Sequence, residues 1–418
     1  MIVNGKFHRL CQNIVGIIES TSWKRTNRIV VFGAWFGIKF ADNSRYLFQY
    51  LHANKDSLGL DHVVWITSNR KLNEELNGLG YESYLNYSET AIYYLKHAGI
   101  HFICNNYDDN GYGTDIPVYY SHGAKKVNLW HGIGVVKGVA GLSNHAREGR
   151  KKHPYITKVR DLIIHSVVYR ELFGAPGGWS NCYYLTPSAL GQKQLSEMFY
   201  IKKNHFIMTG QPRLCECPSL MQEEIALIEE IKQFNTTYLY LPTFRTKNKN
   251  SDYTHLSEEL RPVLEKENIL WIEKPHDADR SAFTHEYSPN IRTLNSDFDI
   301  NTIIPYVQFL ITDYSSVMSD ARYHSIPVIL FLPDYEEYFA GDNGIIEESE
   351  ILMSGPRFTD SNQLVKAIYR YKDDYSSAFY EGYEKISYDE LYSLLFHEKT
   401  SLKQIWLDIL SGLRIHIE

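Results

Sequence analysis

The chain has few cysteines and no long apolar run. Only five of its 418 residues are cysteine, and none of them forms a Cys-x-x-Cys pair. This scattered set is typical of a protein from a reducing compartment and disfavours both a disulfide framework and a structural zinc site. No apolar segment approaches the roughly 20 residues of a membrane span, and the N-terminus lacks the pattern of an export signal. We therefore expect a cytoplasmic protein.

Positive charge and phosphate-binding motifs are also scarce. The 43 Lys and Arg residues are outnumbered by 50 Asp and Glu residues, which disfavours a general nucleic-acid binder. The sequence contains no Gly-x-x-x-x-Gly-Lys-Ser/Thr loop, no strand-linked Gly-x-Gly-x-x-Gly and no His-Glu-x-x-His helix. Asp277-Ala278-Asp279 and Asp297-Phe298-Asp299 fit solvated loops better than a metal site. We expect chemistry that needs no metal and no cofactor.

Short β-rich runs alternate with helical patterns along the whole chain. This alternation predicts an α/β protein with parallel sheets, whose ligands sit beyond the carboxyl ends of the strands. The length predicts two domains of roughly 200 residues, with a boundary between 190 and 205. The tail after Ser361 reads as consecutive helices. The expected strands are Ile29–Phe32, His62–Thr67, Ile100–Cys104, Val127–Trp130, Leu162–His165, His205–Met208, Tyr238–Leu241, Ile269–Ile272, Phe309–Thr312 and Val328–Leu332.

The segment from Phe309 to Tyr338 reads as strand, turn, helix and second strand. Its first strand ends in Thr312-Asp313-Tyr314-Ser315-Ser316, where hydroxyl and carboxylate side chains can cap the following helix. The free N–H groups of such a helix N-terminus attract anions. The helix is expected to stop before Pro327, and the continuous apolar run after it is typical of a buried parallel strand. The turn therefore predicts an anion site.

Other chemistry-bearing residues follow predicted strands. His131 comes after an apolar strand in Trp130-His131-Gly132, where an imidazole could remove a proton from a hydroxyl. A lone histidine is more often a core or turn residue, and its position at a strand end is what favours catalysis. Arg213, Arg245 and His276 also follow strands, and arginine is suited to binding phosphate. Together they predict an anion-lined cleft.

The motifs, taken in order, resemble the CDP-glycerol glycerophosphotransferase family of teichoic-acid and capsule synthesis. The resemblance spans roughly residues 30 to 390. It rests on Asp42-Asn43-Ser44-Arg45-Tyr46-Leu47, Trp130-His131-Gly132, Pro242-Thr243-Phe244-Arg245, Lys274-Pro275-His276, Thr312-Asp313-Tyr314-Ser315-Ser316 and Tyr335-Glu336-Glu337-Tyr338. This chain departs from the family at Ile133-Gly134-Val135-Val136-Lys137, where Thr-Pro-Leu-Lys is usual, and at Leu214-Cys215, where Asn-Asp is usual.

The resemblance implies a glycosyltransferase fold of the B type with two Rossmann-like domains. Residues 1–200 would hold the acceptor and residues 201–385 the CDP-alditol, while helices in 386–418 would pack back on the first lobe. An acceptor hydroxyl, deprotonated by His131, would attack the β-phosphorus of CDP-glycerol or CDP-ribitol and release CMP. His276 would be the second catalytic residue, and Asp313 would bind a polyol hydroxyl or orient His276. The implied substrate-binding residues are Gly132, Arg213, Thr243, Arg245, Asp313, Ser315 and Ser316.

The sequence does not identify the acceptor. A lipid-linked or oligosaccharide acceptor at the inner face of the membrane is expected, and transfer of a single unit is favoured over a long polymer. The basic residues of 145–160 could meet anionic lipid headgroups or form an ordinary solvated loop. Residues 7–18 could lie on a membrane, although a packing helix is more common. The alternatives are a nucleotide-sugar-dependent glycosyltransferase of the same fold and, less favoured, a non-enzymatic nucleotide-binding or scaffold protein.

Overall fold

The computed structural model describes residues 2–105, 114–164, 166–173, 182–243, 256–275, 287–340 and 344–417. The chain divides into two compact units. The first unit comprises Met1–His131, Ala140–Pro218 and His397–Glu418, and the second comprises Gly132–Val139 and Ser219–Phe396. The main crossing between them therefore falls at 218–219 rather than at the expected 200–201, because the strand at Phe206–Met208 belongs to the first unit.

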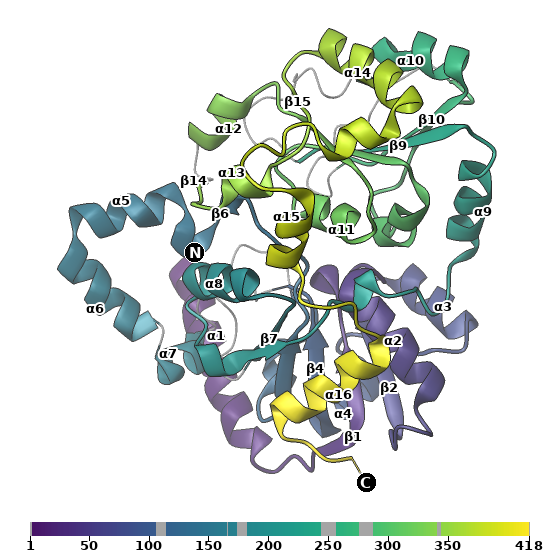
Figure 1. Cartoon of the computed structure of the whole chain (residues 1–418). Coiled ribbons are helices and arrows are strands. Elements are labelled where there is room, and N and C mark those ends of the chain that lie inside the picture. The colour runs from purple at the N-terminus through teal and green to yellow at the C-terminus, as the bar shows by residue number, and fades with distance from the viewer. Residues whose placement is uncertain are drawn as a thin grey trace. The chain divides into compact units, whose positions relative to one another are not determined.

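The first unit is built on a parallel sheet in the order β3-β2-β1-β4-β5-β7-β8 (Figure 1). Its inner strands are almost entirely buried, as expected for a parallel sheet covered on both faces. β1 is aligned with Val30 opposite Val63 of β2 and opposite Ile100 of β4. The strands are β1 (Thr26–Phe32), β2 (His62–Thr67), β3 (Glu82–Leu85), β4 (Ala98–Ile103), β5 (Lys125–Asn128), β7 (Cys182–Thr186) and β8 (Phe206–Met208).

Helices cover both faces of this sheet. Serine side chains begin several of them: Ser88 and Ser188 accept hydrogen bonds from the backbone N–H groups of Ala91 and Gly191. α5 and α6 form a hairpin that extends away from the sheet (Figure 1). The helices are α1 (Ile2–Ser20), α2 (Asp42–Asn54), α3 (Arg70–Gly78), α4 (Glu89–His97), α5 (Asn144–Lys152), α6 (Pro154–Ile164), α7 (Val167–Phe173), α8 (Ala189–Phe199) and α16 (Leu402–Leu413).

The C-terminal helix α16 completes the core of the first unit. Trp406 is 1% exposed and packs with Phe102 of β4, their ring centroids 6.3 Å apart. Thr209, directly after β8, donates a hydrogen bond of 2.6 Å to the Asp408 carboxylate. α16 therefore belongs to the first unit, whereas the preceding helix, α15 (Tyr388–Leu395), belongs to the second unit.

The second unit has a parallel sheet in the order β11-β10-β9-β12-β13-β15. Phe309 of β12 is aligned with Tyr238 of β9, and their rings stack with centroids 4.7 Å apart. These strands are β9 (Thr236–Leu241), β10 (Ile269–Glu273), β11 (Ile291–Thr293), β12 (Phe309–Thr312), β13 (Val328–Phe331) and β15 (Arg357–Phe358). The remaining helices are α9 (Gln222–Ile231), α10 (Leu256–Glu267), α11 (Val317–Tyr323), α12 (Tyr335–Ala340), α13 (Ser349–Leu352) and α14 (Ser361–Asp373).

The short segment Gly132–Val139 packs inside the second unit. Its strand β6 (Lys137–Gly138) pairs antiparallel with β14 (Gly344–Ile345). Gly134 has a φ of +62°, and a Cβ atom there would lie 2.5 Å from Leu395 and 3.0 Å from the Ser319 hydroxyl. Glycine at this departure from the family pattern thus fits a backbone that approaches its neighbours closely.

The prediction of a strand at Leu162–His165 is wrong for Leu162, Ile163 and Ile164, which form the last turn of α6. The run is short and apolar, and such runs do not distinguish a strand from one face of a helix. His165 lies outside the described residues. Among the helices of the described ranges, none is long and apolar enough to cross a membrane.

Candidate functional site

The predicted site residues that the structure describes follow the carboxyl ends of strands in each unit. Each sheet has one point where the strand order reverses, between β1 and β4 in the first unit and between β9 and β12 in the second. Ligands of open α/β sheets bind beyond such points. His131 follows β5, the neighbour of β4, while Thr243 and Asp313 follow β9 and β12. The topology thus places the motifs where binding sites of this fold class form.

The side chain of His131 has a defined hydrogen-bonding state. Its Nδ1 lies 2.8 Å from the carbonyl oxygen of Cys104. Because a carbonyl can only accept, Nδ1 carries the proton, and Nε2 holds the lone pair of the neutral ring. The ring is half-buried, with the Trp35 ring centroid 5.4 Å away and the Trp130 centroid 4.3 Å away.

Burial also keeps His131 neutral. Desolvation lowers the pKa of His131 below its ordinary value of 6.5, although the Asp42 carboxylate and the Cys104 carbonyl oppose the shift. At neutral pH the imidazole is therefore mostly uncharged. A neutral imidazole with Nε2 free of its proton is the form that can accept a proton from a hydroxyl.

Arg213 is placed in the scaffold behind His131. Its side chain is 1% exposed, and its Nη1 lies 2.9 Å from Oδ1 of Asp42. Its backbone N–H donates to the side chain of Asn43, whose amide in turn donates to the carbonyl of Trp130 at 2.6 Å. A buried guanidinium paired with a carboxylate already has its charge compensated, which disfavours the predicted contact with a substrate phosphate.

In the second unit, Asp313 and Thr243 join the two strands at the reversal point. The Asp313 carboxylate accepts hydrogen bonds from the backbone N–H and the hydroxyl of Thr243 and from the backbone N–H of Tyr314. Both side chains are buried, at 3% and 4% exposure. Asp313 and Thr243 therefore hold the turn in place. This role is favoured, and the predicted contact of either side chain with the substrate is disfavoured.

Ser315 and Ser316 are the more accessible part of the predicted anion site. Both are half-buried, and Ser316 precedes α11 without capping it through its side chain. The neighbouring Tyr314 ring stacks on Tyr338, with centroids 3.9 Å apart, and its hydroxyl lies 3.1 Å from the Asp334 carboxylate. This aromatic contact brings the Thr312–Ser316 turn and α12 together at the carboxyl edge of the sheet.

The three remaining predicted site residues are Arg245, His276 and Gly132. Arg245 and His276 lie outside the described residues. Gly132 is half-buried and begins the segment that packs in the second unit. Asp42 and Asn43 have no predicted role, although both stand in a motif of the family resemblance. Their signal was a polar cluster at the start of a helix, which by itself reads as a helix cap.

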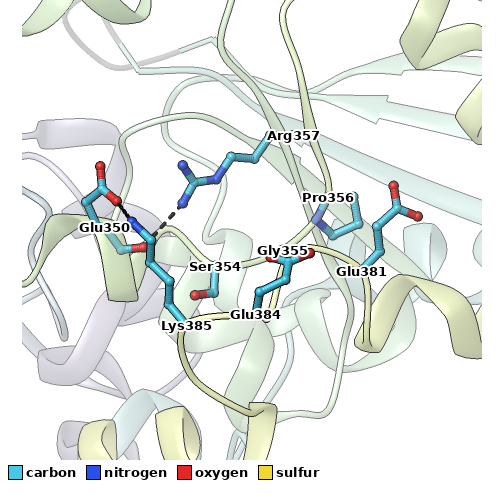
Figure 2. Close-up of a pocket in the computed structure, with 9 residues that line it drawn as sticks. Glu350, Ser354, Gly355, Pro356, Arg357, Glu381, Glu384 and Lys385 are labelled. Atoms are coloured by element: carbon cyan, nitrogen blue, oxygen red, sulfur yellow. Dashed lines mark hydrogen bonds and ion pairs between the residues drawn. The ribbon is translucent and has the colours of Figure 1, made fainter.

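A polar cavity of about 340 Å³ lies at the opposite edge of the second sheet, next to the amino end of β15 (Figure 2). Its cations have partners within the protein: Lys385 pairs with Glu350, and Arg357 donates to the carbonyl oxygens of Met353 and Glu350. No group of three or more metal-ligating side chains comes together in the part of the chain that the structure describes.

Known proteins resemble this chain over most of its length. The poly(glycerol phosphate) polymerase of teichoic acid from Bacillus spizizenii is 23% identical over 401 residues, which cover 90% of this chain and 92% of that protein. The glycerol-phosphate primase of Bacillus subtilis is 25% identical over 252 residues, 58% of this chain and 59% of that protein. The structure of a variant of the wall teichoic acid polymerase TagF soaked with CDPG matches with a TM-score of 0.65 at 17% identity, covering 97% of this chain and 94% of that one.

A family model gives the assignment. The model for CDP-glycerol:poly(glycerophosphate) glycerophosphotransferase matches residues 18–390, which include every motif of the two strand-end sites. The fold is shared with the wall teichoic acid polymerase, and the order of the motifs agrees with the match. The chain belongs to the CDP-glycerol:poly(glycerophosphate) glycerophosphotransferase family.

Proposed function

We propose that this protein transfers glycerol phosphate from CDP-glycerol to a hydroxyl group of a growing teichoic-acid acceptor and releases CMP. The observation that carries the proposal is the state of His131 within a chain of this family. Its Nδ1 is committed to the Cys104 carbonyl, which leaves Nε2 as the proton acceptor of a neutral ring.

The reaction needs one proton transfer and one phosphoryl transfer. His131 Nε2 takes the proton of the acceptor hydroxyl as that oxygen attacks the β-phosphorus of the donor. A new phosphodiester bond forms, and the bond from the β-phosphorus to the bridging oxygen breaks, so that CMP leaves with the electron pair. Ser315, Ser316 and the predicted residues Arg245 and His276 would stabilise the charge of the diphosphate, as positioned donors do in phosphoryl transfer.

The donor and the reaction type can be tested together. Purified protein is incubated with CDP-glycerol or CDP-ribitol and with lipid-linked or oligosaccharide acceptors, and CMP release is followed. We expect CMP with CDP-glycerol, a phosphodiester signal in the phosphorus NMR spectrum of the product, and a product length that distinguishes one added unit from a polymer. No CMP with either donor, or a glycoside without a new phosphodiester, would reject the proposal. The second outcome is that expected of a nucleotide-sugar glycosyltransferase.

The acceptor would be met at an anionic membrane surface. α6 exposes an apolar stripe to solvent, with Ile156 70%, Val159 58% and Leu162 76% exposed. These side chains follow the spacing of one helix face. Exposed lysines flank the stripe, among them Lys152 at the end of α5 and Lys158 on α6. Apolar side chains with adjacent cations are typical of helices that bind the surface of anionic bilayers.

Charge placed on this stripe should weaken binding to vesicles. We expect the double variant Ile156→Glu/Leu162→Glu to bind phosphatidylglycerol vesicles at least about tenfold more weakly, because two apolar side chains are removed from the lipid contact. Co-sedimentation measures the bound fraction. The matched control is Leu79→Glu, which changes an exposed apolar residue of the same unit outside the hairpin. Equal binding of the wild type and the double variant would contradict attachment through α6.

A further inference from the structure

A buried carboxylate lies behind the proposed base. Asp115 is 5% exposed and accepts hydrogen bonds from three backbone N–H groups, those of Cys104 at 2.7 Å, Asn105 at 2.9 Å and Phe36 at 2.7 Å. The side-chain amide of Asn105 lies 3.3 Å from the same carboxylate. Several backbone donors converging on one carboxylate form a rigid anchor.

One hydrogen bond of Asp115 is linked to His131 through a single peptide group. The Asn105 N–H that donates to Asp115 and the Cys104 carbonyl that accepts from His131 belong to the same planar peptide unit. Because that unit is rigid, fixing its N–H end fixes the direction of its carbonyl end. The carbonyl direction in turn selects the Nδ1-protonated form of the imidazole.

Another hydrogen bond of Asp115 holds the loop that carries Trp35, an aromatic neighbour of His131. Trp35 and Phe36 both have left-handed backbone conformations, with φ of 46° and 59°. Such backbone conformations are unfavourable for residues with a Cβ atom and persist only where the surroundings hold them. Here the Phe36 N–H is bound by Asp115, and the Trp35 ring lies 5.4 Å from the His131 ring. Asp115 therefore supports two separate contacts of His131.

We propose that Asp115 is a positioning residue that sets the tautomer and orientation of His131. The inference rests on the proposed role of His131 as the base. In this role Asp115 would contact neither the substrate nor the reacting atoms. It acts through the peptide group between Cys104 and Asn105 and through the loop that carries Trp35.

The variant Asp115→Asn tests this role with little change of volume. One carboxylate oxygen becomes an amide that faces backbone donors, so the anchor loses a hydrogen bond and its charge. We expect kcat for CMP release to fall about 10- to 100-fold, as for other residues that orient a catalytic histidine. The KM for CDP-glycerol should change less than about twofold, because the variant leaves the second unit unchanged. Nitrogen-15 NMR of His131 should show one tautomer in the wild type and a mixture in the variant.

Two further variants make the result decisive. Asp408→Asn alters a half-buried aspartate elsewhere in the first unit, whose partners are Thr209 and Gln404, and should leave kcat and the His131 signals unchanged. If Asp115→Asn does not fold, Asn105→Ala removes the side-chain contacts to Asp115 and to the Cys104 sulfur but keeps the backbone N–H that donates to Asp115. It should shift both readouts in the same direction by less.

The outcomes separate this inference from the proposed function. Loss of activity in His131→Ala, together with an unchanged kcat and a single tautomer in Asp115→Asn, would overturn the positioning role and leave the base assignment standing. Full activity in His131→Ala would overturn the base assignment itself. A fall in kcat with a changed tautomer in Asp115→Asn supports the inference.

Discussion

Replacing His131 by alanine should lower the rate of CMP release by about 10²- to 10⁴-fold, the range typical of removing a general base. The affinity for CDP-glycerol should stay within about twofold of the wild type if the donor is held by the second unit. Stopped assays of CMP release and calorimetric titration with CDP-glycerol measure the two quantities. A loss of donor affinity that accounts for the whole loss of rate would contradict the role of a base.

A control and a pH profile sharpen this result. His97 also has its Nδ1 near a backbone carbonyl, that of Tyr93 at 2.7 Å, but it lies at the end of α4, away from the residues around His131. His97→Ala should leave the rate unchanged.

Because burial lowers the pKa of His131 below 6.5, its base form persists to a lower pH than that of an exposed histidine. The kcat of the wild type should therefore stay level below pH 6.5 and fall only as the pH drops through the lowered pKa.

Replacing Arg213 by methionine should reduce the free energy of unfolding by about 3–5 kcal/mol, because the buried Asp42 carboxylate would lose the positive charge that compensates it. Urea denaturation measures the loss. The surface pair of Arg28 and Asp61, whose side chains are 47% and 46% exposed, provides the matched control. Arg28→Met should cost no more than about 1 kcal/mol, since water screens an exposed pair.

The same variant separates two interpretations of Arg213. If Arg213 supports the His131 loop, the folded fraction of Arg213→Met should keep its KM for CDP-glycerol while its stability falls. If Arg213 clamps a phosphate, as the sequence predicts, the KM should rise strongly and the stability should hardly change. The ion pair with Asp42 leads us to expect the first result.

Local patterns predicted most of the sheets because parallel strands are short and apolar in this chain. The strands His62–Thr67 and Phe309–Thr312 have the predicted bounds. The strands β3 and β7 were missed because their sequences, Glu82–Leu85 and Cys182–Thr186, mix polar and aromatic residues. In these strands, pairing with neighbours that lie far away in sequence outweighs the local pattern.

The sequence likewise predicted the positions of some site residues but not their partners. The positions of His131, Ser315 and Ser316 after strands follow from βα alternation, since carboxyl ends of parallel strands share one edge. The alternation of strands and helices does not predict the hydrogen-bond and ion-pair partners of Arg213, Thr243 and Asp313. Asp115 carries no signal in the sequence either, because its three donors are backbone groups, which any residue type supplies.

The sequence alone determined the fold class, the family resemblance and the strand ends at which polar residues gather, because hydrophobic periodicity and ordered motifs are local properties of a chain. The tertiary structure decided which of those residues point outward and which hold the site together. Arg213 with Asp42, and Thr243 with Asp313, became buried pairs. His131 gained a single tautomer from a carbonyl 27 residues away. Burial and partner choice depend on segments distant in sequence, so only the folded chain can set them.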